Sequence, residues 1–198
     1  MSRLRSICVF CGSSPGSDPA YLAAARALGA AMGRAGLTLV FGAGNVGLMG
    51  ATATAAIAEG GRVVGVIPEH LTRVETPHGE LMELHVVESM HVRKRLMFER
   101  SDAICVLPGG LGTLDETFEI LTWKQLGLHE KPVIFLNING YWDPLLGLID
   151  AIVAQGFARP SVRDLYTVVD GVEAIIPAAR QGLPEGDLHP ESPTSERF

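Results

Sequence analysis

The feature that most constrains the fold is a regular alternation between short apolar, β-rich segments and longer helical ones. The β-rich segments, such as ICVF at 7–10 and VIFL at 133–136, are apolar throughout and do not alternate with polar residues. Strands of this kind are buried on both faces, which is typical of a parallel sheet between two layers of helices. The sequence therefore predicts an α/β fold with a doubly wound, mainly parallel Rossmann-like sheet.

The boundaries of the elements follow from apolar runs, glycine and proline. We expect strands at 6–11, 37–41, 62–67, 84–87, 102–107, 131–137 and 166–169. We expect helices at 19–35, 48–59, 90–100, 113–126, 142–155 and 171–180, the first with Asp18 as N-cap before Pro19. We predict a single α/β domain over residues 1–180, and a mobile tail over the polar, proline-rich residues 181–198.

Composition narrows the classes of partner. The 198 residues carry a formal net charge of −6, which argues against a nucleic-acid surface but not against a small anionic ligand. The apolar run that follows Arg3 and Arg5 is too short for a secretory signal. The uncharged stretch 35–58 contains turn-forming glycines and is interpreted as a strand, a turn and a helix instead of a membrane span. We expect a cytoplasmic protein without a membrane segment.

The cysteines and histidines do not indicate a metal site. Cys8 and Cys11 form a C-x-x-C pair, but residues three apart on a strand point to opposite faces. No second pair of metal-ligating residues accompanies them, and the histidines lack the close spacing of metal ligands. We expect buried, reduced cysteines and neither a metal nor a cofactor.

A first glycine turn lies at 41–50, FGAGNVGLMG, between a predicted strand and a predicted helix. Gly42, Gly44 and Gly47 match G-x-G-x-x-G, the fingerprint of dinucleotide sites, although the match alone is weak. The acidic residue that would bind a ribose is Glu69, which follows a proline. The alternative is a tight strand-to-helix turn that needs glycine for its backbone alone.

A second glycine turn, LPGGLGTLDE at 107–116, also joins a strand to a helix. Gly109, Gly110 and Gly112 allow the backbone to present N–H groups next to a helix N-terminus, which together form an anion site. The lysine of a Walker A loop is absent, so the turn fits a monophosphate better than a triphosphate.

Two pairs of residues, one within this turn and one on the predicted helix at 90–100, have structural as well as functional interpretations. Thr113 and Glu116 have the spacing of a capping box, with Thr113 as N-cap and Glu116 at the third helical position. In the structural interpretation, Arg93 and Lys94 lie on an ordinary solvated face of a helix. From local sequence alone these alternatives stay open.

Together, MHVRK at 90–94 and PGGLGTLDE at 108–116 resemble the LONELY GUY family of cytokinin-activating phosphoribohydrolases, often mislabelled as lysine decarboxylases. ICVFCGSSPG at 7–16 and GAGNVGLMG at 42–50 are also similar to the family, with Ala43 in place of a glycine. The resemblance implies a homodimer or a larger assembly of dimers. It also implies hydrolysis of the N-glycosidic bond of N6-modified adenosine 5′-monophosphates, and of AMP, to a free base and ribose 5-phosphate.

The resemblance also implies the site. Arg93 and Glu116 would be catalytic. The substrate contacts would come from Glu75, Arg93, Lys94, Gly109, Gly110, Leu111, Gly112, Thr113, Leu114, Asp115, Glu116 and Thr122. At position 115 this sequence has aspartate, whereas many members of the family carry glutamate.

The implied chemistry suits these residue types. Breaking a ribosyl C–N bond builds positive charge on the sugar, and a carboxylate such as Glu116 stabilises it. Arg93 would hold Glu116 ionised, contact the phosphate or stabilise the leaving base, and the sequence does not choose among these roles.

Two other functions are weighed against hydrolysis. One is a nucleotide-binding or carrier protein without turnover. The other is a pyridoxal-phosphate decarboxylase, which would need a Schiff-base lysine among Lys94, Lys124 and Lys131.

Overall fold

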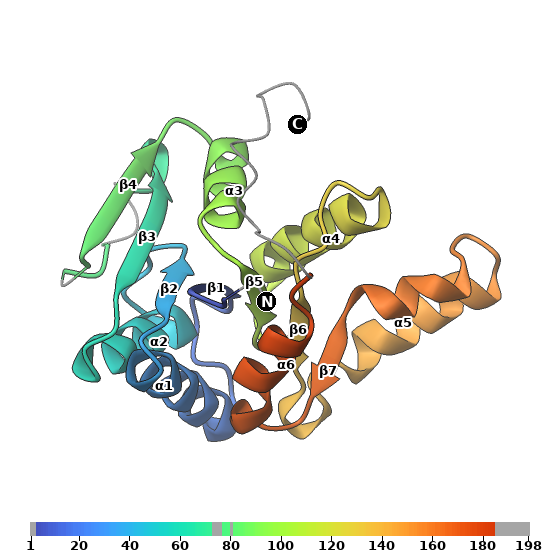
Figure 1. Ribbon diagram of the computed structural model, residues 1–198, viewed down its shortest axis with the longest axis horizontal. Helices are drawn as coiled ribbons and strands as arrows, with labels where there is room; N and C mark the ends of the chain where they lie inside the picture. The colour runs from blue at the N-terminus through green and yellow to red at the C-terminus, as the bar shows by residue number, and fades with distance from the viewer. Residues whose placement is uncertain (1–2, 73–76, 80, 185–198) are drawn as a thin grey trace.

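The protein folds as one seven-stranded sheet with helices on both faces, as Figure 1 shows for a computed structural model. The structure describes residues 3–72, 77–79 and 81–184. All six pairings between neighbouring strands are parallel, in the order β4-β3-β2-β1-β5-β6-β7. The strands are β1 Ser6–Phe10, β2 Thr38–Phe41, β3 Val63–Pro68, β4 Glu83–Val87, β5 Ala103–Val106, β6 Val133–Leu136 and β7 Thr167–Val169. The predicted doubly wound α/β fold is confirmed.

The helices fall close to their predicted places. They are α1 Pro19–Arg34, α2 Gly47–Ala58, α3 Met90–Glu99, α4 Leu111–Gln125, α5 Asp143–Ala154 and α6 Ile175–Gln181. Asp18 caps α1 as predicted, since its side chain accepts a hydrogen bond from the Ala20 N–H at 2.8 Å. The predicted last helix begins instead as a 3₁₀ turn over Val172–Ala174, and a further 3₁₀ segment at Pro160–Leu165 was not predicted.

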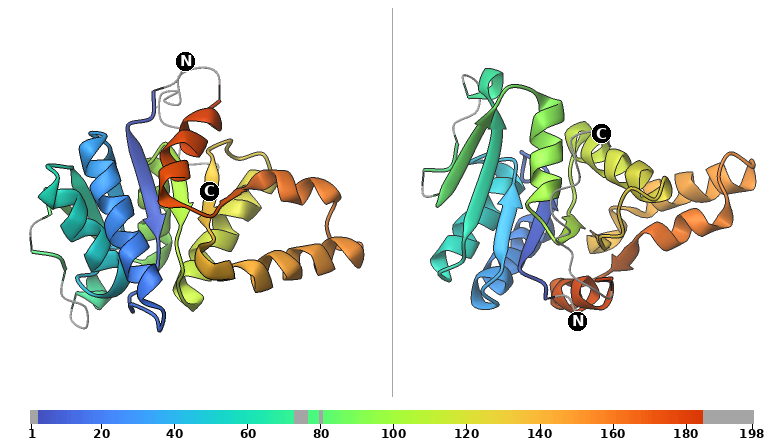
Figure 2. Two further views of the ribbon diagram at one scale, coloured as in Figure 1. Left: turned by 90° about the horizontal axis from the view of Figure 1, so that it is seen from below. Right: turned by 45° about the horizontal axis from the view of Figure 1, so that its top comes forward.

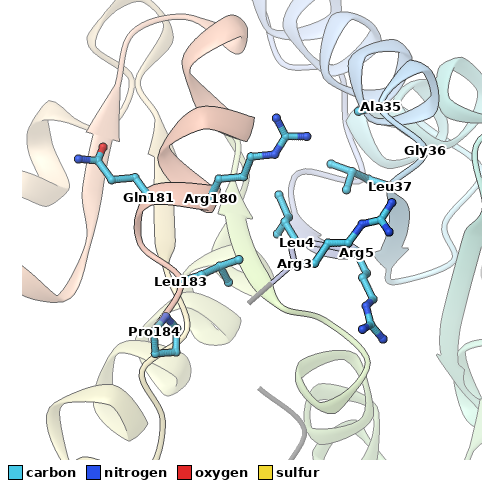
Figure 3. A pocket seen from close by; sticks show the side chains of 10 residues that line it. All are labelled: Arg3, Leu4, Arg5, Ala35, Gly36, Leu37, Arg180, Gln181, Leu183 and Pro184. Atoms are coloured by element: carbon cyan, nitrogen blue, oxygen red, sulfur yellow. The ribbon is translucent and has the colours of Figure 1, made fainter. Parts of the chain in front are cut away.

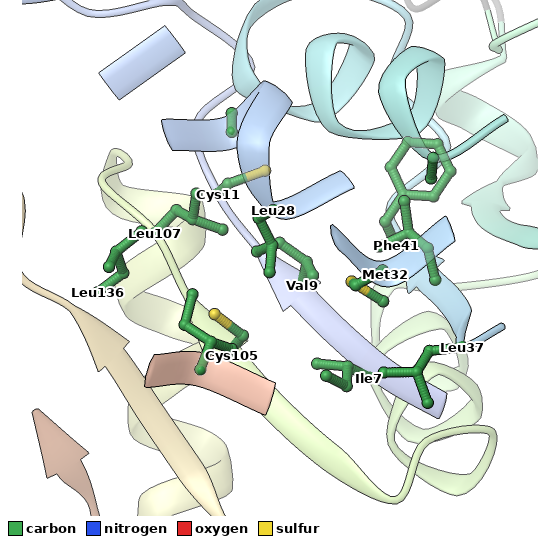
Figure 4. Packing of buried hydrophobic residues seen from close by; sticks show 14 of the residues in the cluster. Ile7, Val9, Cys11, Leu28, Met32, Leu37, Phe41, Cys105, Leu107 and Leu136 are labelled. Carbon is green, nitrogen blue, oxygen red and sulfur yellow. The ribbon is translucent and has the colours of Figure 1, made fainter. Parts of the chain in front are cut away.

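Two hydrophobic cores lie on opposite faces of the sheet. The core beneath α1, α2 and α6 contains Cys11 and Cys105, and Figure 4 shows its packing around Leu28 and Met32. The core beneath α3, α4 and α5 contains Cys8. The prediction that the two cysteines of the C-x-x-C pair point to opposite faces is therefore confirmed, and all three cysteines are buried and free.

The winding reverses between β1 and β5. From β1 the chain runs through β2, β3 and β4 to one edge, and from β5 through β6 and β7 to the other. Figure 2 shows α1 and α2 on one side of this sheet, with α3 and α4 on the other. Ligands of such sheets bind at the carboxyl ends of the strands where the winding reverses. Both glycine turns and the loop after β1 lie at this edge.

The predicted capping box is wrong. Helix α4 begins at Leu111, with the extended residue Gly110 as N-cap (φ −95°, ψ −156°). Thr113 is therefore the third helical residue and Glu116 the sixth. A carboxylate in the second turn of a helix does not reach the N-cap N–H, so the structure removes the local structural explanation for Glu116.

Candidate active site

The N-terminus of α4 presents free backbone donors at the reversal point of the sheet. Leu114 N–H bonds to the Gly110 carbonyl at 3.1 Å, whereas the N–H groups of Leu111, Gly112 and Thr113 have no hydrogen-bond partner among the described residues. No side chain caps this helix. Three free donors at the positive end of a helix dipole form a site for an anion such as a phosphate.

At the N-terminus of α2, after the first glycine turn, backbone N–H groups are not free. The N–H groups of Leu48 and Met49 both donate to the Gly12 carbonyl, at 3.0 and 3.3 Å. The donors that a dinucleotide would need are therefore already bonded. This arrangement favours the structural interpretation of the first turn over the dinucleotide one.

The glycines of the second turn do not share one role. A Cβ on Gly109 would lie 2.1 Å from Thr113 Oγ1 and 2.9 Å from the Gly12 nitrogen, so this position needs glycine for close packing. A Cβ on Gly110 or Gly112 would meet nothing within 4 Å. These two glycines border open space, which is where a ligand would lie.

A cavity of about 360 Å³ opens beside this turn. The loop at 12–17, the turn at 108–110, and the side chains of Tyr21, Leu48 and Tyr141 line it. Tyr141 also donates a hydrogen bond from its hydroxyl to the Gly109 carbonyl, which fixes the turn from outside.

Arg93 is buried between α3 and the first glycine turn. Its side chain is 7% exposed, and its Nη2 donates to the Gly42 carbonyl at 3.1 Å. Nη1 contacts the Met90 sulfur at 3.7 Å, and Nε is buried with no partner among the described residues. A buried guanidinium with unused donors is the arrangement expected of a residue that contacts a ligand or a nearby carboxylate.

Glu116 lies on α4, close enough to Arg93 and Lys94 for their charges to act on its carboxyl. Its carboxylate is half-buried and has no hydrogen-bond partner among the described residues. Burial raises the pKa of Glu116 from 4.5 to about 7, while the nearby charge of Arg93 opposes this rise. Asp115 and Glu119 raise the pKa further, and Lys94 lowers it. A shifted carboxyl group beside an open anion site is a candidate catalytic group.

Lys94 connects the two helices that carry Arg93 and Glu116. Its ammonium lies 3.1 Å from Asp115 Oδ2 and 3.0 Å from Glu119 Oε2. Its side chain is only 13% exposed. Lys94 is therefore engaged in holding α3 against α4, in addition to the substrate contact that the sequence predicted for it.

Among the described residues, the side chains of the remaining predicted contacts lie apart from this cluster. Thr122 is exposed on α4, six residues beyond Glu116 and about 240° further around the helix. Leu111 is 85% exposed at the start of α4, and Leu114 packs against the core. Glu75 lies outside the described residues, as do residues 185–198 of the predicted tail.

Sequence reasoning missed the contacts of three residues that build the site. Gly12 links the loops, because its N–H donates to the Pro108 carbonyl at 3.0 Å while its own carbonyl bonds to α2. Gly42 contacts Arg93, and Tyr141 contacts the second turn. The family-like segments 7–16 and 42–50 contain Gly12 and Gly42 and were a signal. The contacts themselves join residues far apart along the chain and do not follow from local pattern.

None of the lysines is in the position of a Schiff-base residue. Besides Lys94, Lys124 donates to the Lys131 carbonyl at 3.0 Å. Lys131 donates to the carbonyls of Phe98 and Ser101 at 2.6 Å each, near the end of α3. Burial lowers the pKa of Lys131 to about 8, but its amine is directed at these carbonyls and lies at the opposite edge of the sheet from the glycine turns. The residues present do not fit a pyridoxal-phosphate decarboxylase.

A second cavity, of about 880 Å³, lies at that opposite edge. Figure 3 shows Arg3, Arg5 and Arg180 around it, next to the C-terminal ends of α1 and α6. Basic side chains are favourable at helix C-termini, so these arginines have a structural explanation.

No group of three or more metal-ligating side chains occurs in the part of the chain that the structure describes. No described helix has the length and hydropathy needed to cross a bilayer.

Taken together, the site combines an anion cradle, a carboxylate and a buried guanidinium. The amides at 111–113 would bind a phosphate and so fix the attached sugar. The Glu116 carboxylate would lie where positive charge develops on that sugar, and Arg93 supplies donors for the carboxylate or the ligand.

Comparison with known proteins identifies the relatives of the chain. Residues 49–179 match a family model described as "possible lysine decarboxylase". A cytokinin riboside 5′-monophosphate phosphoribohydrolase of Rhodococcoides fascians is 49% identical over 89% of this chain and 89% of its own. The enzyme of that name, LOG7, from Arabidopsis thaliana is 42% identical over 94% of this chain and 86% of its own.

Among solved structures, the fold is shared with two proteins of low sequence identity. The molybdenum cofactor carrier protein of Chlamydomonas reinhardtii is 22% identical and has a TM-score of 0.69 over 91% of this chain and 98% of its own. The molybdenum cofactor binding protein of Rippkaea orientalis is 23% identical, with a TM-score of 0.69 over 90% and 97%. At this identity the likeness shows the fold alone. The identities with the curated enzymes show more: the chain belongs to the LONELY GUY family of cytokinin riboside 5′-monophosphate phosphoribohydrolases.

Proposed function

We propose that this protein hydrolyses the N-glycosidic bond of N6-modified adenosine 5′-monophosphates, and of AMP, to a free base and ribose 5-phosphate. With a prenylated base this reaction activates a cytokinin. We place the enzyme in the cytoplasm, in keeping with its buried thiols. Arg93 and Glu116 are its catalytic residues, and the turn at 109–116 holds the phosphate.

The observation that carries the proposal is the Glu116 carboxylate beside the free amides at the start of α4. It is partly buried, makes no hydrogen bond within the described residues and does not cap its helix. A protein that only bound an anion would gain nothing from a carboxylate near that anion. A carboxylate does stabilise the positive charge of an oxocarbenium-like transition state.

The test is chromatography of the purified protein with AMP and with N6-isopentenyl-AMP, to detect the free base. The control is Glu116→Gln, which keeps the shape and removes the charge. Release by the wild type and not by Glu116→Gln supports hydrolysis. Tight binding of either nucleotide without release by the wild type would instead support a carrier.

We also propose that the enzyme is a homodimer or a larger assembly of dimers that uses the exposed face of α4. Leu111, Phe118 and Leu126 are 85%, 38% and 67% exposed on that helix. Thr122, an expected substrate contact, lies among them and points away from Glu116. A second copy packed on this face would cover the apolar side chains and bring its own Thr122 near the site.

A further inference from the structure

Gly42 is the point at which the first glycine turn contacts Arg93. It directly follows β2, and its carbonyl accepts the hydrogen bond from Arg93 Nη2 across 51 positions of sequence. A Cβ added to Gly42 would lie 1.9 Å from Nη2 and 3.0 Å from Cζ of Arg93. Any side chain at this position would have to displace the guanidinium or the backbone.

The backbone conformation of Gly42 does not explain the glycine. Gly47, in the same turn, has a φ of +64° and belongs to the left-handed region that favours glycine. Gly42 is absent from the residues with positive φ. The space occupied by the guanidinium is therefore the reason for glycine at residue 42.

The contact fixes one edge of a guanidinium that is otherwise weakly held. Among the described residues, the Gly42 carbonyl is the one oxygen that accepts a hydrogen bond from the Arg93 guanidinium, beside the long contact to the Met90 sulfur. Nε stays without a partner. The contact therefore orients Arg93 while it leaves donors available to a ligand or to Glu116.

We propose that Gly42 is a positioning residue for catalysis: its carbonyl and its lack of a side chain hold the Arg93 guanidinium beside Glu116. The proposal rests on the proposed function, because it takes Arg93 to act in the reaction. It gives the first glycine of G-x-G-x-x-G a role that is unrelated to dinucleotide binding.

The experiment is a double-mutant cycle with Gly42→Ala and Arg93→Lys, in which kcat/KM for AMP and Tm are both measured. Lysine has no atom at the position of Nη2, so it relieves the contact with a new Cβ. Gly42→Ala is expected to lower kcat/KM about 100-fold, as misplacement of a reacting group by about 1 Å does. In the Arg93→Lys background, the same change should lower kcat/KM less than about twofold and recover most of the Tm loss.

Gly44→Ala is the matched control in the same turn. The three atoms nearest to its Cβ would all belong to the side chain of Met49, the closest being the flexible terminal Cε at 2.7 Å. It should keep kcat/KM within about threefold of the wild type, because a flexible side chain moves at little cost.

Each outcome decides the proposal. Wild-type activity in Gly42→Ala, or equal losses of activity and Tm in both backgrounds, would show that residue 42 does not act through Arg93. If Gly42→Ala does not fold but the double variant does, the contact is supported; if neither folds, it is refuted. Absence of turnover in the wild type would refute the proposed function, and the Tm cycle would still decide whether Gly42 positions Arg93.

Discussion

At the scale of single residues, Glu116 combines a catalytic assignment with a measurable cost in stability. The folded protein raises the pKa of this carboxyl from 4.5 to about 7. The protonated carboxyl therefore adds stability that is complete below pH 4.5 and is lost as the pH rises through 7. At pH 8 the buried charge lowers the free energy of unfolding.

Glu116→Gln should therefore be more stable than the wild type at pH 8 although it is inactive. We expect a gain of about 1–3 kcal/mol in the free energy of unfolding, measured by urea denaturation, and a smaller gain at pH 5. The sign of this change in the free energy of unfolding distinguishes a buried catalytic carboxyl from a glutamate that caps the helix. A capping glutamate would lose stability on substitution at pH 8, which would contradict the structure.

Asp115 adds to the effect of burial on the pKa of Glu116. Its negative charge raises the pKa of Glu116, and in the proposed mechanism Glu116 has to be ionised. The wild type should lose kcat/KM below about pH 7, and Asp115→Asn should move this acid limb to lower pH. Asp150→Asn is the control, because Asp150 on α5 pairs with Arg163 of the 3₁₀ segment Pro160–Leu165 and is not among the charges that shift the pKa of Glu116. An unchanged limb in Asp115→Asn would mean that Glu116 is not the group that titrates.

At the scale of elements, the N-terminus of α4 is the proposed phosphate site, and its amides can be removed singly. Leu111 is the first helical residue, where proline is favoured, and the extended Gly110 before it accommodates proline. Leu111→Pro deletes one N–H, while Leu111→Ala keeps it. Leu111 is 85% exposed in the single chain, and both variants remove the leucine side chain from the proposed α4 interface, so their difference reports on the N–H.

We expect Leu111→Pro to weaken AMP binding about 10- to 100-fold relative to Leu111→Ala, which is the range for a hydrogen bond to a charged group. Calorimetry in the Glu116→Gln background would measure this without turnover. Binding of adenosine, which has no phosphate, should differ little between the two variants. Equal AMP affinities would place the phosphate elsewhere.

The elements themselves follow from sequence more directly than their ends or their contacts. Apolar runs placed the five inner strands because these are buried on both faces of the sheet, whereas the edge strands β4 and β7 are partly exposed. The start of α4 was missed because Thr113 and Glu116 match a capping box, and only the backbone of Gly110 decides the register. The contact between Gly42 and Arg93 joins residues 51 apart, so no local pattern contains it.

At the scale of the whole molecule, the reversal of the sheet explains why residues from distant segments form one site. The loop after β1, the first glycine turn and the second glycine turn all end at the carboxyl edge, and Gly12 bonds to both of the others. Helices α3 and α4 cover the same face and are joined by Lys94. One chain thus assembles the amides, Arg93 and Glu116, but leaves Thr122 on an outer surface.

The exposed apolar face of α4, which carries Thr122, predicts that several copies of the chain assemble through it. Phe118→Glu would place a charge within the exposed apolar face of α4, and we expect it to reduce the particle to a single chain of 21.1 kDa in sedimentation. Leu148→Glu, 51% exposed on α5, is the control and should leave the assembly intact. If the α4 helix of a second copy completes the site, the monomer should also lose AMP hydrolysis. In a monomer no second copy brings its Thr122 near Glu116. A fully active monomer would show that one chain is sufficient and that Thr122 has no part in binding.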